Sequence, residues 1–210
     1  MTLRRVLFRA SLALAGLAVG LAGASYAAAW WFQRGPGLEH EADRLTRVAD
    51  VRPGMTLAEI GAGSGRLAAR MARRVGESGR VYATEISPFL IERIGQVAAA
   101  RGVTNVSRIL AGDRDTGLPP ACCEVIYMRR VYHHLKDPPA INSGLYAALR
   151  PGGRLVVIDF LTPGWLPLRR HGVDPSAVKS QVSAAGFRFD RALDRWSLLD
   201  YCLVFRKPDR

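Results

Sequence analysis

Apolar positions along the chain follow two alternating periods. Short apolar runs of strand length are separated by stretches in which apolar residues recur every three or four positions, as on the buried face of a helix. The expected strands are residues 57–60, 80–86, 105–110, 124–128, 155–160, 187–193 and 201–205. The expected helices are residues 39–51, 67–75, 88–98, 139–149 and 174–185. Strands that alternate with helices predict one α/β domain.

The first expected strand runs directly into a glycine turn, in the stretch MTLAEIGAGSGRL at residues 55–67. Gly61, Gly63 and Gly65 stand at alternate positions, where glycine permits positive φ angles and lets a ligand approach bare backbone. The dinucleotide fingerprint G-x-G-x-x-G fails because Arg66 occupies its third glycine position, and the phosphate-binding Walker motif is absent. A ligand-binding turn and a purely structural turn both stay open at this point.

Glu85 lies at the end of the second expected strand, about 20 residues beyond the glycines. A carboxylate at this position can accept hydrogen bonds from both hydroxyls of a ribose. The alternative is an acid that caps a helix or lies on the surface. The spacing favours ribose binding.

Five features, in this order, resemble the class I S-adenosylmethionine (SAM) methyltransferases. They are the acidic-x-G-x-G-x-G turn beginning at Glu59, the acid Glu85, the Gly-Asp pair at 112–113, the string Y-H-H-L-x-D-P at 132–138 and L-R-P-G-G at 149–153. The resemblance covers residues 38–208, and the small bacterial type 11-like proteins of this class look most similar. Each motif is weak alone, but their order makes the combination specific.

The resemblance implies a doubly wound α/β fold, with a mostly parallel seven-stranded sheet whose last strand is antiparallel. It implies SAM as cofactor and requires no metal. Glu59 would suit the amino acid end and the sulfonium cation of SAM, Glu85 the ribose and Asp113 the adenine amino group, with Asp115 as a competitor. The expected cofactor-binding residues are Glu59, Gly61, Ala62, Gly63, Gly65, Glu85 and Asp113.

His133 and His134 follow the fourth expected strand, whose carboxyl end should lie at the rim of the ligand crevice. Either histidine could act as a general base, because a neutral imidazole titrates near working pH; a structural hydrogen bond is the alternative. Asp159, near the end of the fifth strand, is a further candidate for contacting substrate. Arg129 and Arg130 replace residues that are small in many relatives, and could narrow the pocket or place a cation near the substrate.

The N-terminal segment is distinct from the rest of the chain. Residues 10–32 carry no charge, are long enough to span a bilayer as a helix and end in an aromatic Trp-Trp-Phe group, with arginines before them. We interpret residues 1–34 as a single-pass membrane anchor and residues 35–210 as the methyltransferase domain. The alternatives are a secretory signal that is cleaved, which would leave the domain exported, and a soluble buried helix. The side of the membrane that holds the domain stays open.

The formal net charge is +12, and nearly all the positive charge comes from arginine. Beside a membrane segment, a basic surface suggests contact with anionic headgroups. Nucleic acid is not an expected partner, because no interleaved aromatic and basic patch or RNA-binding module is found. Cys122, Cys123 and Cys202 lack zinc-site spacing and are interpreted as packing residues. The oligomeric state is not determined by these features.

Together these features predict an enzyme that transfers the methyl group of SAM to a small apolar or membrane-associated acceptor. The acceptor atom and its identity stay open. The first alternative is a non-catalytic, membrane-attached module that binds SAM. The second is an NAD-linked oxidoreductase, which Arg66 disfavours.

Overall fold

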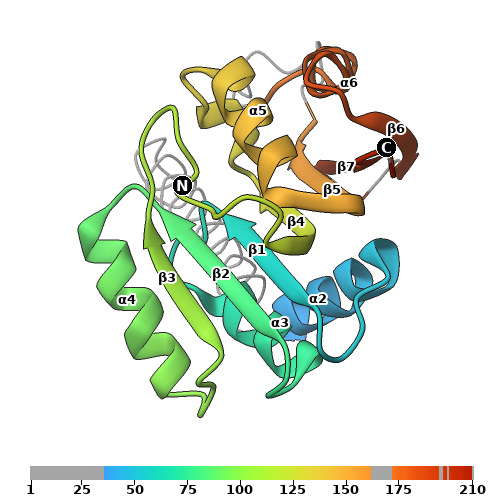
Figure 1. Ribbon diagram of the computed structural model, residues 1–210. Coiled ribbons are helices and arrows are strands. Elements are labelled where there is room, and N and C mark those ends of the chain that lie inside the picture. Colours follow the sequence, from blue (N-terminus) through green and yellow to red (C-terminus); the bar gives the residue numbers. More distant parts are fainter. Residues whose placement is uncertain (1–35, 162–171, 194–195, 198, 210) are drawn as a thin grey trace, which may run out of the picture. The chain divides into compact units, whose positions relative to one another are not determined.

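A computed structural model describes residues 36–161, 172–193, 196–197 and 199–209 (Figure 1). The chain divides into two compact units, Met1–Glu41 and Ala42–Arg210, and the fold given below is that of the second. Within the described residues, no helix is long and apolar enough to cross a membrane. The predicted anchor at residues 1–34 lies outside them and stays a prediction.

Within the described residues, seven strands form one sheet in the order β3-β2-β1-β4-β5-β7-β6 (Figure 1). Their bounds are β1 Thr56–Ile60, β2 Arg80–Glu85, β3 Val106–Leu110, β4 Cys123–Arg129, β5 Leu149–Phe160, β6 Arg188–Leu193 and β7 Asp200–Arg206. Strands β1 to β5 pair in parallel, and β7 lies antiparallel between β5 and β6. The predicted seven-stranded sheet with an antiparallel last strand is confirmed.

The helices form two groups. They are α2 Pro36–Ala49, α3 Arg66–Val75, α4 Pro88–Ala99, α5 Pro138–Ala148 and α6 Pro175–Ala184, with a 3-10 turn, η1, at Tyr132–His134. Helices α3 and α4 contact each other, as do α5 and α6. From β1 the chain adds β2 and β3 on one side, and then β4 and β5 on the other side. Because the crossovers between parallel strands are right-handed, this reversal places the two groups of helices on opposite faces of the sheet.

The central strands are buried on both faces, as their apolar runs predicted. Side chains of β4 and β5 at residues 125–128 and 155–158 are almost fully buried. Ala58 and Ile60 of β1 pack in one cluster with residues of α5 and α6, whereas the intervening Glu59 points to the other face. This alternation decides which side chain beside the glycine turn can reach a ligand.

The L-R-P-G-G stretch differs in detail from its prediction. It was expected to form a turn before a strand that begins at residue 155, but β5 already begins at Leu149. Leu149 pairs with Cys123 and Arg154 with Val125, so the register shifts between these pairs. Gly152, with a φ of 72°, lies within this irregular stretch. The stretch therefore both ends α5 and starts β5.

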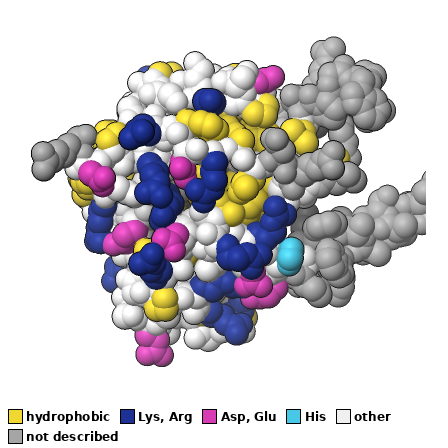
Figure 2. Space-filling model, turned by 90° about the vertical axis from the view of Figure 1, so that its right-hand side faces the viewer, with side chains coloured by type: hydrophobic (Ala, Val, Ile, Leu, Met, Phe, Trp, Pro, Cys, Tyr) yellow, Lys and Arg dark blue, Asp and Glu magenta, His cyan; other side chains and the backbone are white. Residues whose placement is uncertain are grey.

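Charged side chains are spread over the surface rather than gathered in one block. Figure 2 shows Lys and Arg side chains across one face with acidic side chains among them. Several arginines pair with acids at the surface, among them Arg74 with Asp43 and Arg191 with Asp190. Such exposed pairs contribute only about 0–1 kcal/mol each to stability.

Candidate active site

The glycine turn after β1 exposes bare backbone to the crevice. Gly63 has a φ of 55°, and a Cβ added to it would meet no described atom within 4 Å. Gly65 has a φ of 74°, and a Cβ there would come within 2.9 Å of the Ile94 side chain. The two glycines therefore differ in purpose. Gly65 lets α4 pack closely against the turn, whereas Gly63 leaves open space for a ligand.

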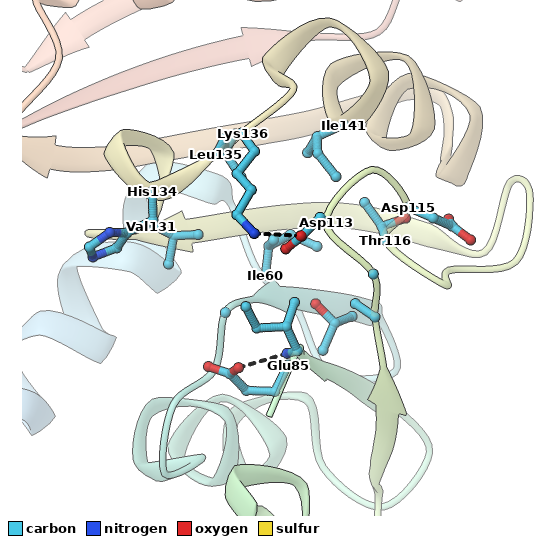
Figure 3. A pocket seen from close by; sticks show the side chains of 15 residues that line it. Ile60, Glu85, Asp113, Asp115, Thr116, Val131, His134, Leu135, Lys136 and Ile141 are labelled. Carbon is cyan, nitrogen blue, oxygen red and sulfur yellow. Dashed lines mark hydrogen bonds and ion pairs between the residues drawn. The ribbon is translucent and has the colours of Figure 1, made fainter. Parts of the chain in front are cut away.

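The Glu85 carboxylate is fixed beside this turn by two backbone groups. The N–H of Gly63 donates to Oε1 at 3.1 Å, and the N–H of Ile86 donates to Oε2 at 2.8 Å. Each carboxylate oxygen has a second lone pair, so both can accept a further hydrogen bond. Figure 3 shows the carboxylate at the foot of the pocket. A pair of neighbouring hydroxyls, as in a ribose, matches this arrangement.

A pocket of about 740 Å³, part of it open to solvent, lies at the carboxyl ends of β1, β2, β3 and β4. This is the reversal point of the strand order, where open α/β sheets bind ligands. Its walls are Ile60, Gly61, Thr84, Glu85, Ile86, Ala111, Gly112, Asp113, Asp115, Thr116, Val131, His134, Leu135, Lys136 and Ile141 (Figure 3).

The walls fit a nucleoside. Apolar side chains from three elements, Ile60, Val131 and Ile141 among them, offer a slot for a flat base. Thr84 is 1% exposed, and its hydroxyl has no hydrogen-bond partner among the described residues. A buried hydroxyl without a partner is costly, so a polar ligand group would satisfy it. With Glu85, the pocket offers polar groups for a sugar beside an apolar slot.

Asp113 lies on the pocket wall in an ion pair with Lys136. The Nζ of Lys136 lies 2.6 Å from Oδ2 of Asp113, and Figure 3 shows the lysine reaching across the pocket to it. Both side chains are exposed, at 73% for Lys136 and 48% for Asp113. Asp115, the competitor, also lines the pocket, but its Oδ1 accepts the N–H of Gly117 at 3.0 Å. The role of Asp113 toward adenine stays a prediction.

Glu59 and Ala62 lie beside the pocket but are not part of its walls. Glu59 is 4% exposed and accepts a hydrogen bond from the Tyr127 hydroxyl at 3.3 Å. Burial, and then the Glu59 charge, raise the pKa of Tyr127 well above its ordinary value. The backbone N–H of Ala62 donates to the carbonyl oxygen of Thr84 at 3.0 Å. The predicted contact of Glu59 with the amino acid end of SAM is not tested by this arrangement.

The two histidines after β4 have different surroundings. His134 is exposed and lies on the pocket wall, beside Val131 in Figure 3. His133 is mostly buried, outside the pocket walls, and its Nδ1 lies 2.7 Å from Oδ1 of Asp159. The two imidazole rings are 3.9 Å apart between centroids. The structure thus separates two residues that the sequence left equivalent.

Asp159 holds His133 rather than facing the crevice. It is fully buried, and its Oδ2 accepts the backbone N–H of His133 at 3.0 Å. The prediction that Asp159 contacts substrate did not include this pairing. A usable signal was present, because the carboxyl ends of two parallel strands meet at the same edge if the strands are neighbours.

Arg130 forms an ion pair with the buried Asp200. Its Nε and Nη2 donate to the two carboxylate oxygens of Asp200, at 3.1 and 2.8 Å. Asp200 is 1% exposed, and the guanidinium also lies 4.8 Å from the ring centroid of Phe160. Arg130 was expected to narrow the pocket or to place a cation near the substrate. The structure instead uses its charge to satisfy a buried carboxylate.

The structure describes the possible metal ligands but not most of the segment assigned to the acceptor pocket. No group of three His, Cys, Asp or Glu side chains that could hold a metal ion occurs in the described part of the chain. The resemblance assigns the segment Thr162–Val173 to the acceptor pocket, and residues 162–171 of it lie outside that part. The acceptor side of the crevice is consequently described only as far as Leu161.

Two curated methyltransferases are similar to this chain in sequence. Protein-L-isoaspartate O-methyltransferase of Aeropyrum pernix is 33% identical over 117 residues, 54% of this chain and 42% of the relative. Nocamycin O-methyltransferase of Saccharothrix syringae is 30% identical over 143 residues, 68% of this chain and 50% of the relative. The chain thus spans about half the length of these curated relatives.

A solved structure of a SAM-dependent methyltransferase from Aquifex aeolicus has the same fold, with a TM-score of 0.73 and 20% identity. The match covers 79% of this chain and 89% of that one. A family model described as a methyltransferase domain matches residues 52–193, which include the glycine turn, Glu85, Asp113 and both histidines. Family and fold together imply SAM as the cofactor. The chain therefore belongs to the methyltransferase domain family.

Proposed function

We propose that this protein transfers the methyl group of SAM to a small apolar or amphipathic acceptor. The observation that carries the proposal is the Glu85 carboxylate, fixed by Gly63 and Ile86 at the foot of a nucleoside-sized pocket. Membership in the methyltransferase domain family supports the assignment of this pocket to SAM.

The residues of the chain would act mainly by binding and orienting the reactants. SAM supplies a methyl group that is already activated by its sulfonium charge. Glu85 would hold the ribose, the Thr84 hydroxyl would bond a polar group beside it, and Asp113 would accept from the adenine amino group. Holding two reactants in line can supply a large part of a rate enhancement by itself.

The proposal of a small acceptor rests on the uncharged N-terminal segment rather than on the described pocket, whose largely apolar walls are assigned to SAM. Of the two relatives, one bears the name of a small molecule and the other of a protein residue, so relatives alone do not decide. The uncharged segment at residues 10–32 would hold the domain at a bilayer and raise the effective concentration of membrane-dissolved acceptors.

Ligand binding is the first test. In a thermal-shift assay of the full chain, SAM and S-adenosylhomocysteine should raise the melting temperature and NAD should not, because only a ligand that binds the native state stabilises it. Stabilisation by NAD alone would overturn the cofactor assignment.

Methyl transfer is the second test. Labelled SAM is incubated with the full chain and, separately, with a lipid and quinone extract, total protein and RNA. We expect label in the organic-extractable fraction. Label confined to protein or RNA would contradict the small acceptor, and SAM binding without transfer to any fraction would support the non-catalytic module instead.

Cell fractionation tests the membrane proposal. The full chain is compared with a variant that starts at Gly35, which removes the uncharged segment. We expect the full chain in the membrane fraction at its full mass and the shortened chain outside it. A full chain that is soluble and uncleaved would overturn the anchor, and a shortened product in the exported fraction would favour the signal.

A further inference from the structure

Asp159 is a buried carboxylate that accepts three hydrogen bonds beside the crevice. Its Oδ1 lies 2.7 Å from Nδ1 of His133 and accepts the N–H of Phe160 at 2.7 Å, while its Oδ2 accepts the N–H of His133 at 3.0 Å. The carboxylate is fully buried. Three donors from two elements therefore fix both the carboxylate and the histidine.

This geometry selects one tautomer of His133. An ionised carboxylate has no proton to give, so the hydrogen bond at Nδ1 requires an N–H there. The lone pair of the neutral ring then lies on Nε2, and no described residue hydrogen-bonds that atom. Nε2 of His133 can thus accept a proton, and the buried Asp159 fixes the direction in which this atom points.

The pair lies where an acceptor would approach. His133 is in η1, between the pocket-wall residues Val131 and His134, and its ring faces Phe160 at the end of β5, 5.4 Å away between centroids. The pocket occupies the carboxyl ends of β1 to β4, and β5 is the next strand of the sheet, so the pair lies beside the described pocket. The His133 side chain keeps 10% of its surface exposed, which is enough for its edge to meet a ligand.

We propose that Asp159 is a positioning residue for His133, that His133 and not His134 is the general base, and that the acceptor is a hydroxyl. This inference rests on the proposed methyl transfer and names its acceptor atom. A hydroxyl keeps its proton at neutral pH and needs a base to become a good nucleophile, whereas a neutral amine attacks unaided. An oriented imidazole whose Nε2 has no hydrogen-bond partner among the described residues supplies that need.

In the step that follows, the acceptor oxygen bonds to the methyl carbon while the carbon–sulfur bond breaks and its electron pair stays on sulfur. The hydroxyl proton passes to Nε2 of His133, and Asp159 stabilises the resulting imidazolium. The proton then leaves to solvent. The products are an O-methylated acceptor and S-adenosylhomocysteine, so atoms and charge balance.

Histidine nitrogen NMR of the full chain tests the tautomer without an acceptor. At about pH 8.5, where unperturbed imidazoles are neutral, one histidine should show the Nδ1–H tautomer, and this signal should vanish in His133→Gln. In Asp159→Asn the remaining His133 should switch to Nε2–H. The switch occurs when the asparagine turns its nitrogen, which donates, toward Nδ1 and its oxygen toward the backbone N–H of His133, and the same loss of the correct tautomer is known when a positioning aspartate becomes asparagine.

Activity tests the role. With labelled SAM and the lipid and quinone extract, Asp159→Asn and His133→Gln should each lose about 100-fold or more in rate, and the loss in His134→Gln, a change in the pocket wall itself, should be smaller than in either. SAM affinity by calorimetry should stay within about twofold of wild type in Asp159→Asn and His133→Gln. The labelled product should carry its methyl group on oxygen.

Glu124→Gln is the matched control. Glu124 also accepts a backbone N–H, that of Thr56 at 2.7 Å. It lies near the start of β4, at the amino ends of the parallel strands, whereas the crevice lies at their carboxyl ends. It should reproduce any general loss of stability and leave the tautomer and the rate unchanged. A wild-type His133 in the Nε2–H form, an unchanged rate in Asp159→Asn, or a methyl group on nitrogen or carbon would overturn the inference. If no acceptor fraction is labelled at all, the proposed function fails, and the tautomer still decides whether Asp159 positions His133.

Discussion

Replacing Glu85 by Gln tests the cofactor assignment most directly, because the change keeps the side-chain shape. In the structure both carboxylate oxygens accept from backbone, one from Gly63 and one from Ile86. The glutamine nitrogen cannot accept, so one of the two N–H groups loses its partner whichever way the amide turns. The expected cost in the free energy of unfolding is about 1 kcal/mol, since the site is partly open to water.

The loss of SAM affinity should exceed this loss of stability. A hydrogen bond to a charged group contributes about 1.5–3 kcal/mol, and the carboxylate would accept two from the ribose. The amide keeps one neutral acceptor, so we expect a net loss of about 1.5–3 kcal/mol. This corresponds to a dissociation constant that is about 10- to 100-fold higher.

Calorimetry with S-adenosylhomocysteine measures this loss, and chemical unfolding of the same samples measures stability. Glu77→Gln is the control, because Glu77 is an exposed glutamate just before the other end of β2. It removes the same charge from the same region without touching the pocket. If folded Glu85→Gln binds S-adenosylhomocysteine within about twofold of wild type, the assignment of Glu85 to the ribose is refuted. If Glu77→Gln loses as much affinity as Glu85→Gln, the loss reflects the general change in charge rather than a contact with the ribose.

Two further predictions concern other ionisable groups. Lys136→Met removes an exposed ion pair and should change stability by less than about 0.5 kcal/mol, yet it frees Asp113 and should tighten SAM binding up to about fivefold at low salt. Calorimetry decides, and weaker binding would show that Lys136 contributes to holding the cofactor. Burial is the main cause that raises the pKa of Tyr127, Tyr132 and Tyr201. These groups are neutral in both states below about pH 10; above it only the unfolded tyrosines ionise, so stability should fall as pH rises through the folded pKa values. Urea unfolding between about pH 8 and 12 measures this, and a flat stability profile would contradict it.

The fold and the cofactor half of the site could be predicted because their signals are local. The apolar runs fix the strands, the glycines at 61, 63 and 65 fix the turn, and Glu85 lies one strand further on. The strands and the turn need only the residues next to them in sequence, and Glu85 meets Gly63 across 22 positions because the consecutive strands β1 and β2 pair. The position of Glu59 was also accessible, because alternation along β1 places its side chain on the opposite face from Ile60, which lines the pocket.

The acceptor half could not be predicted in the same way because its contacts join distant residues. His133 meets Asp159 across 26 positions and Arg130 meets Asp200 across 70. The first pair exists because β4 lies beside β5, the next strand along the chain, and the second because β7 rather than β6 lies beside β5. A hydrophobic pattern identifies a strand but does not name its neighbour, so such pairs become visible only once the sheet order is known.

Arg130 fixes the direction of the backbone at the end of β4, directly before the residues that line the pocket. It is a non-glycine residue with a φ of 57°, a conformation that costs about 1–2 kcal/mol. Its backbone N–H donates to the carbonyl oxygen of Ile158 at 2.7 Å, and its side chain neutralises the buried Asp200. These contacts offset the strain and hold a sharp change of direction at the end of β4. Directly after this change, Val131 and His134 line the pocket while His133 meets Asp159 on β5. Arg130 is thus placed where it can set the direction in which both histidines point.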